Sequence, residues 1–332
     1  MAVGVTEYQE RPAAVGAGAE LAEVDLGAIA ARSPWQLFWR RFREDKLAMA
    51  SLVFLVLLIL MAIFAPLVIK IVGAPPPNET DSTALDIFGT ATGPSSAHIF
   101  GVDQLGRDVF SRTVYGARVS LIVAVAATGL ATFGGVVAGL LAGYFRGWVD
   151  TFVSRAVDVL LAIPYLLFAV GLAAACTLGG AGCLGGLIKP GIGVVIVVIA
   201  FTSWTYMARI IRGQTLSLRE KEFIESARSI GSSHTRIIFK ELLPNLVAPI
   251  VVYASILVPQ VILYEAALSF LGVGVQPPTA SWGQMISDAT PTFSEAPWYM
   301  LFPGIALLLT VLAFNLVGDA MQDALNPRAK KT

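Results

Sequence analysis

Side chains that could perform catalysis or bind a metal are few in this chain and lie far apart. The only histidines are His98 and His234, and the only cysteines are Cys176 and Cys183. The sequence contains no His-Glu-x-x-His, Gly-x-Ser-x-Gly or Gly-x-x-x-x-Gly-Lys-Ser/Thr segment, the patterns of zinc proteases, serine hydrolases and phosphate-binding loops. We therefore expect no catalytic residues and no metal site, and the chain cannot hydrolyse ATP by the phosphate-loop route.

Cys176 and Cys183 share a short Gly-rich connection between two apolar stretches. We expect this connection to face the outside, where an oxidising compartment would permit a disulfide. Two free thiols are the alternative. Metal binding there is not expected, because no histidine or third thiol lies nearby to complete a site.

Composition indicates a protein that crosses a membrane several times. Apolar residues make up 56% of the chain and charged residues only 14%. The net charge is zero, so it identifies no partner, and nothing supports nucleic-acid binding. Six uncharged runs are long enough to span a hydrocarbon core of about 30 Å, so we predict an all-α polytopic protein with six transmembrane helices. These runs are Leu47–Ile69, Val119–Phe145, Val159–Ile188, Pro190–Ala208, Leu242–Tyr264 and Ala296–Gly318.

Two further segments should lie beside the membrane without crossing it. Ala266–Ser287 is uncharged, but its glycines and prolines would leave backbone groups unsatisfied against lipid, which favours a re-entrant or surface loop. The run from Pro34 to Lys46 mixes aromatic and cationic side chains. It is either an amphipathic helix on the inner membrane face or a basic flank that only orients the first span.

The lysines and arginines predict the orientation of the chain, because these residues accumulate on the cytoplasmic side of membrane proteins. If the N-terminus is inside, most of the 23 lysines and arginines fall in inner segments. Both termini are therefore predicted to be cytoplasmic. Residues 1–33 lack a basic region followed by an apolar core and a cleavage site, so we expect a disordered tail and no cleaved signal peptide.

The ionisable residues Asp158, Glu265 and Asp319 lie near the ends of the predicted spans. A carrier driven by protons or sodium is expected to bury at least one carboxylate at mid-depth in the membrane. The apparent lack of one disfavours such a carrier and indicates that energy for transport comes from elsewhere.

The loop between the fourth and fifth predicted spans, residues 212–245, is charged but carries apolar residues at helical spacing. This pattern predicts short amphipathic helices. Gly231 would reverse the chain between them, and Pro244 would mark the start of the fifth span. A helix–turn–helix that transmits a push and a solvated loop that only enforces topology both fit these residues.

A family resemblance favours the first of these interpretations. The series Glu225-Ser226-Ala227, then Gly231, then Leu243-Pro244 resembles the Glu-Ala-Ala loop of ABC-importer permeases. Ser226 replaces the usual second alanine, and Glu241 stands where many members have isoleucine. The resemblance implies that this loop docks into a groove of an ATPase subunit, with the following residues in the coupling loop: Glu222, Glu225, Ser226, Ala227, Gly231, Leu243 and Pro244.

A second motif precedes the second predicted span. From the residues alone we expect a surface helix capped by Asp103, with Asp103–Arg107 and Asp108–Arg112 pairs at i, i+4 and with Leu105 against Val109. The segment Phe100–Arg112 with Tyr115–Arg118 also resembles C-type permeases of dipeptide and oligopeptide importers, as do Leu268–Pro278 and Gly318–Arg328. The motif residues are Asp103, Gly106, Arg107, Asp108 and Arg112.

This resemblance implies the type I ABC importer permease fold and a non-catalytic permease subunit that moves dipeptides or oligopeptides across a bacterial cytoplasmic membrane. The implied partners are a homologous second permease, two ATPase subunits or one fused ATPase, an extracytoplasmic substrate-binding protein and the lipid bilayer. ATP and Mg would bind the ATPase partners, and this chain itself would bind no cofactor. The alternatives are a same-family importer of nickel chelates, glutathione or haem, and then an ion-coupled carrier or an intramembrane hydrolase.

Gly135, Gly139 and Gly143 recur every fourth residue in the second predicted span, so they share one helix face and allow another helix to approach closely. That helix could belong to the same chain or to the homologous permease. Pro164 is expected to kink the third span.

These expectations divide the chain into five parts. They are a tail (1–33), an interfacial helix with the first span (34–72), an extracytoplasmic loop with a short helix (73–117), the permease core (118–321) and a cytoplasmic tail (322–332).

Overall fold

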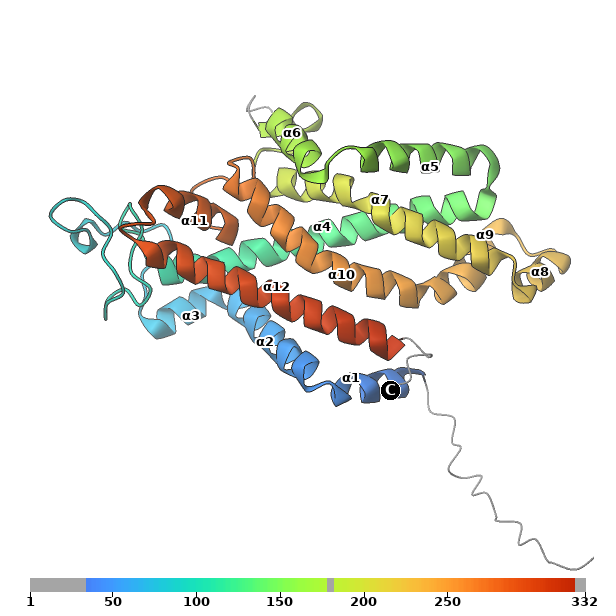
Figure 1. Ribbon diagram of the computed structural model, residues 1–332, viewed down its shortest axis with the longest axis horizontal. Coiled ribbons are helices and arrows are strands. Elements are labelled where there is room, and N and C mark those ends of the chain that lie inside the picture. Colours follow the sequence, from blue (N-terminus) through green and yellow to red (C-terminus); the bar gives the residue numbers. More distant parts are fainter. Residues whose placement is uncertain (1–33, 178–181, 326–332) are drawn as a thin grey trace, which may run out of the picture.

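The computed structural model describes residues 34–177 and 182–325, so the predicted N-terminal tail and residues 326–332 lie outside the described residues. Every regular element longer than an isolated bridge in these ranges is helical. The helices form an elongated bundle (Figure 1). They are α1 (Pro34–Glu44), α2 (Lys46–Ile63), α3 (Ala65–Val72), η2 (Ser82–Ala84), α4 (Val109–Phe145), α5 (Gly147–Ala162), α6 (Tyr165–Thr177), η3 (Leu184–Gly186), α7 (Ile192–Arg219), α8 (Glu222–Ser229), α9 (His234–Arg236), the π-helical η4 (Ile237–Leu242), α10 (Leu243–Phe270), α11 (Trp282–Ala289), η5 (Thr290–Thr292) and α12 (Pro297–Leu325).

Within the described ranges, five helices are long and apolar enough to cross a membrane, and a bent pair brings the number to six if it is one span. The pair is α5 with α6, which meet at 93°. Val159–Ile188 is therefore not one straight helix. Pro164 stands at the bend, where it cannot donate a backbone hydrogen bond to α5 and disfavours helical geometry in the residue before it. The predicted kink is confirmed, and it is sharp enough to end one helix and begin another.

Two spanning helices extend beyond their apolar runs. α4 begins at Val109 rather than Val119, because Asp108 accepts a hydrogen bond from the Ser111 amide at 2.7 Å and caps the helix there. The fifth spanning helix runs continuously from His234 to Phe270. Pro244 therefore does not mark its start. The π-helical residues just before the proline carry the helix through, so the charged loop and the membrane segment share one rod.

α4 and α7 pack closely along the glycine ladder. A Cβ atom on Gly135 would lie 2.5 Å from the Met207 Cβ, and one on Gly139 would lie 2.5 Å from the Ala208 carbonyl oxygen. A Cβ on Gly143 would meet the Thr215 side chain at 2.7 Å. The ladder is therefore used within the chain, and this face of α4 is not free for a second subunit.

α1 packs against the bundle rather than standing apart from it. Phe38 and Phe42 are buried and join α2 and α12 in one apolar cluster. Arg40 remains exposed on the opposite side of α1 and pairs with Glu44. In Figure 1, α1 lies beside the C-terminal end of α12, toward the end of the bundle that carries α8, while α11 and the loop before α4 lie at the other end.

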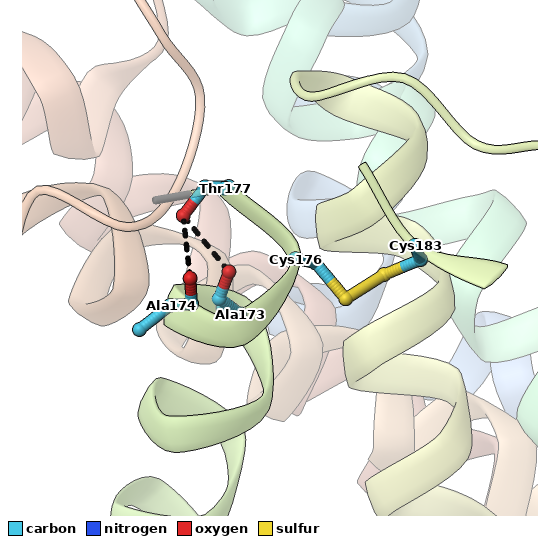
Figure 2. The surroundings of a disulfide bond; sticks show 5 residues. All are labelled: Ala173, Ala174, Cys176, Thr177 and Cys183. Carbon is cyan, nitrogen blue, oxygen red and sulfur yellow. Dashed lines mark hydrogen bonds between the residues drawn. A yellow bond between two sulfur atoms is a disulfide. The ribbon is translucent and has the colours of Figure 1, made fainter. Parts of the chain in front are cut away.

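The disulfide that the sequence left open is formed between Cys176 and Cys183 (Figure 2). It joins the end of α6 to the segment that leads to α7. Thr177 reinforces the same helix end by donating its hydroxyl hydrogen bond to the Ala173 carbonyl at 2.9 Å. Both sulfur-bearing residues are buried in the cluster formed by α4, α6, α7 and α10, so the bond holds the start of α7 beside α6.

Candidate functional site: the α8 loop and the outer polar cluster

α8 divides the predicted coupling residues into an outer and an inner set. Glu222, Glu225 and Ser226 are exposed on the surface of the helix. Ala227 is buried, together with Ile224, against α4, α7 and α10. Both glutamates lie in the first turn, where the partial positive charge of a helix N-terminus stabilises them. α8 thus presents an acidic surface on an apolar seat.

Gly231 reverses the chain at the end of α8, as its position in the sequence predicts. Its φ is +76°, a left-handed conformation that glycine adopts without a steric penalty. The Gly231 amide donates to the Arg228 carbonyl at 2.9 Å, and the Ser232 amide donates to the Ala227 carbonyl at 3.0 Å. This hydrogen-bonded reversal turns the chain directly into the rod that begins at His234.

The seat beneath α8 is built mainly from the rod and from α4 and α7. Ile237, Leu242 and Leu246 are buried there, and Leu243 packs against them while half-buried. Pro244 is exposed. Leu243 therefore supports the loop by packing within the chain. Pro244 lies on the surface, where another molecule can contact it directly.

Polar contacts that sequence patterns did not indicate tie this end of α4 to the loop. The Tyr144 hydroxyl and the His234 Nδ1 atom lie 2.8 Å apart. Arg219 donates to the Tyr144 carbonyl, and Arg146 forms an ion pair with Glu220. Because these partners are far apart in the sequence, no spacing rule could have found them. They hold the seat of α8 in place from the α4 side.

Two apolar side chains at α8 and its C-terminal end are open to solvent. Ile230 is 79% exposed and Phe223 is 38% exposed. They lie two helical turns apart, which places them on the same side of α8. The helical spacing of these apolar residues was readable from the sequence, but their exposure was not. An exposed apolar pair beside glutamates suits a protein partner.

The motif before α4 is a capped turn rather than a helix. The Asp103 carboxylate accepts hydrogen bonds from the amides of Leu105 and Arg107, both at 2.9 Å. The predicted Asp103–Arg107 ion pair is present at 2.7 Å. Gly106 has a φ of +72°, and a Cβ there would lie 2.3 Å from the Asp81 carbonyl oxygen. This tight turn requires glycine at position 106. The turn prevents a helix from starting at Asp103.

The predicted Asp108–Arg112 pair does not form. Asp108 caps α4 and bonds the His98 Nδ1 atom at 2.9 Å. Arg112 is buried, lies 3.6 Å from Asp103, and donates to the Pro77 carbonyl at 3.2 Å and the Asn78 side-chain oxygen at 3.1 Å. These contacts fasten residues 75–78 to the start of α4. The predicted Leu105–Val109 contact is also wrong, since Leu105 is exposed and Val109 is buried.

Glu265 lies near the end of α10, as predicted, but it does not reach solvent. Its exposed fraction is 0%. The Ser120 hydroxyl of α4 donates to one carboxyl oxygen and the Ser269 hydroxyl of α10 to the other, both at 2.8 Å. Ser281, just before α11, lies beside the same carboxyl group. No sequence pattern indicated this cluster, because its members lie far apart in the chain.

A groove with a volume of about 350 Å³ runs between α7 and α10. Its lining mixes hydroxyl, amide and apolar side chains, and none of the described residues that line it carries a formal charge. Across the residues that the structure describes, no group of three or more His, Cys, Asp and Glu side chains could hold a metal ion. The polar lining residues are Ser203, Tyr206, Tyr253, Gln260 and Tyr264.

Comparison with known proteins agrees with this architecture. Residues 135–331 match the family described as the binding-protein-dependent transport system inner membrane component. Residues 33–87 match the N-terminal TM domain of oligopeptide transport permease C. A chain of the MetNI methionine ABC transporter, solved in an inward-facing conformation, superposes with a TM-score of 0.53 at 20% identity, covering 65% of this chain and 97% of that one. At this identity the likeness shows the fold alone.

Two curated relatives are similar over most of their length. The dipeptide transport system permease protein DppC of Alkalihalophilus pseudofirmus is 40% identical, and the alignment covers 90% of this chain and 91% of that protein. The glutathione transport system permease protein GsiD of Escherichia coli is 43% identical, with coverage of 90% and 92%. With these similarities and its membrane helices, the chain belongs to the family of binding-protein-dependent transport system inner membrane components, as a multi-pass ABC permease of the C type found in peptide importers.

Proposed function

We propose that this chain is the non-catalytic permease subunit of an ABC importer that carries dipeptides or oligopeptides across a bacterial cytoplasmic membrane. The observation that carries the proposal is α8, an exposed acidic and apolar helix held on a buried seat. An exposed surface of this kind is typical of a site that binds another protein. ATP and Mg bind that partner, which is a pair of ATPase subunits or one fused ATPase.

The rod from His234 to Phe270 supplies a path for the mechanical step. Closure of the ATPases displaces α8, and the buried contacts of Ile224 and Ala227 pass this movement to the rod and to α7. Both helices line the uncharged groove. Their rotation opens the pathway toward the binding protein, and ATP hydrolysis resets it.

The groove between α7 and α10 is one wall of the pathway in this proposal, and a homologous permease supplies the other. Side chains such as Tyr206 and Gln260 can bond peptide groups without selecting for charge. Selection among peptides then rests with an extracytoplasmic substrate-binding protein. α8 and both termini face the cytoplasm in this arrangement, which agrees with the distribution of lysines and arginines.

Reconstitution tests the proposal directly. The complex that co-purifies with this chain is placed in liposomes with its binding protein, and entry of a labelled dipeptide is followed with and without ATP. We expect entry only with ATP. Absence of any ATPase in the purified complex would refute the proposal, whereas uptake that follows a proton gradient without ATP would favour the ion-coupled alternative.

Glutathione is the second candidate substrate, because the GsiD relative is as similar to this chain as DppC. The same liposomes separate the two by competition. Excess glutathione should leave dipeptide entry unchanged if the proposal is correct. An assembled ATPase complex that transports glutathione, a nickel chelate or haem but no peptide would keep the machine and replace its substrate.

A further inference from the structure

We propose that Glu265 is a positioning residue that couples the movement of the α10 rod to the outer loop of this subunit. This inference rests on the function proposed above. Glu265 is a fully buried carboxyl group, and none of the ion pairs among the described residues includes it. Its hydrogen bonds come instead from hydroxyl groups on different elements.

The first link joins α10 to α4. The Ser120 hydroxyl donates to the Glu265 Oε2 atom at 2.8 Å. Ser120 is itself fully buried, so water cannot replace this hydrogen bond. A polar contact of this kind fixes the relative position of two helices that otherwise meet through apolar side chains.

The second link joins α10 to the loop that follows it. Ser269 donates to the Glu265 Oε1 atom at 2.8 Å, and its own Oγ accepts a hydrogen bond from the Val275 amide at 3.1 Å. The loop lies directly on this part of the helix, because a Cβ on Gly274 would be 2.3 Å from the Ser269 Oγ. The carboxyl group therefore orients the serine that holds the loop.

The third link reaches α11. Ser281 lies beside the Glu265 carboxyl and accepts a hydrogen bond from the Gln284 amide at 3.2 Å as the N-cap of α11. Gly283 packs so closely on α10 that a Cβ there would lie 2.5 Å from the Ala266 Cα. Trp282, fully buried beside it, donates from Nε1 to the Thr113 carbonyl of α4 at 3.0 Å.

Glu265 thus lies where α10 meets α4 and α11, close to the end of the rod at Phe270. α8 and α11 lie at opposite ends of the bundle (Figure 1). The rod is continuous from His234 to Phe270, so a displacement that begins at α8 arrives at Glu265. We call the Glu265 carboxyl group and the serines around it, Ser120, Ser269 and Ser281, the joint. With the joint intact, the outer loop must move together with the rod. Without the joint, the rod can move while the loop stays in place, and ATP is hydrolysed without delivery of substrate.

The test measures substrate molecules taken in per ATP hydrolysed by the reconstituted complex. Glu265→Leu keeps a similar side-chain volume but removes the hydrogen bonds from Ser120 and Ser269. We expect this ratio to fall about tenfold while ATP hydrolysis stays within about twofold of wild type. Glu265→Gln retains a donor and an acceptor and should restore the ratio to within about threefold. Ser120→Ala removes only the α4 link and should give an intermediate loss. Glu295→Leu, an exposed glutamate outside the joint, is the matched control.

An equal ratio in wild type and Glu265→Leu would overturn the inference. A parallel loss of assembly, ATP hydrolysis and uptake in Glu265→Leu, with Ser120→Ala and Glu265→Gln unaffected, would also overturn it, because the residue would then serve folding alone. Absence of ATP-dependent uptake in the wild-type complex would instead count against the proposed function.

A second measurement reads the joint without any substrate. Thr279→Cys places a thiol in the outer loop, and the native cysteines do not react because they are bonded to each other. We expect ATP to change the rate of maleimide labelling in the otherwise wild-type complex and to have no effect when Glu265→Leu is added. A rate that still responds to ATP in the double variant would refute the coupling role.

Discussion

The side chains at α8 form two groups with different roles, and sequence similarity alone does not distinguish the groups. Ala227 and Ile224 pack inward and hold the helix on its seat. Glu225, Phe223 and Ile230 face outward. A bulky charge at Ala227 would therefore abolish uptake by unseating the helix, whereas a change at Ile230 would act on the partner.

Ile230→Asp tests the outward role. We expect the ATPase subunits to bind at least about tenfold more weakly, since burial of an isoleucine at the interface contributes about 1.5–3 kcal/mol. The amount of ATPase retained by the purified permease measures this loss. Ile87→Asp is the matched control, because Ile87 is 94% exposed and lies in the loop at the other end of the molecule. Equal retention of ATPase by both variants would remove Ile230 from the docking surface.

Local rules found the turn residues of the site and missed its long-range partners. Gly231 and the Asp103–Arg107 pair were predictable because each depends on residues within one turn of chain. The Asp108–Arg112 pair failed because His98 supplies a closer partner for Asp108. Spacing rules assume that no third residue competes, and only the fold shows which residues do.

Helix packing in the bundle depends on where side chains are absent. Gly139 lets the α7 backbone come so near that an added Cβ would meet the Ala208 carbonyl oxygen. Gly129, on the same helix, has no atom within 4 Å of its added Cβ. The two glycines lie on the same helix, but only Gly139 is needed for the close approach of α4 and α7.

Gly139→Ala should destabilise the protein by about 1–3 kcal/mol, because a backbone atom of α7 would have to shift. Gly129→Ala should be neutral or stabilising by up to about 1 kcal/mol, because alanine favours a helix and meets nothing there. Thermal unfolding of the purified protein in detergent compares them. A larger loss of stability in the Gly129 variant would contradict the packing described here.

Five of the six predicted spans correspond to spanning helices in the predicted order, whereas the third corresponds to the bent pair α5 and α6. Several helix ends were not predictable. Long uncharged runs report where lipid can surround a helix. They do not report that Asp108 caps α4 beyond the apolar run, or that a π-helical stretch carries α10 past Pro244. Pro164 was identified as a kink, but the angle between α5 and α6 depends on what each helix packs against.

In the proposed assembly, one end of the bundle meets the ATPases and the other end meets the binding protein. α8 and the end of α12 lie toward one end, and α6 lies away from it (Figure 1). The orientation of the whole chain is therefore testable in the connection between α6 and α7.

A membrane-impermeant maleimide should label intact cells that express Leu187→Cys, since Leu187 is 81% exposed in this connection. The native cysteines should not react, because they are buried and bonded to each other. The chain without the Leu187 substitution controls for labelling of other proteins. Labelling that requires opening of the membrane would reverse the proposed orientation.

The packing of α1 also bears on the order in which the protein is made. Phe38 and Phe42 leave the ribosome early, yet part of the cluster that buries them belongs to α12, including Ala313 and Val317. Until α12 has been synthesised, this part of the surface that buries the two rings is missing. The first described helix therefore reaches its final place among the last, and a chain that stalls before α12 exposes two aromatic rings that cellular quality control can recognise.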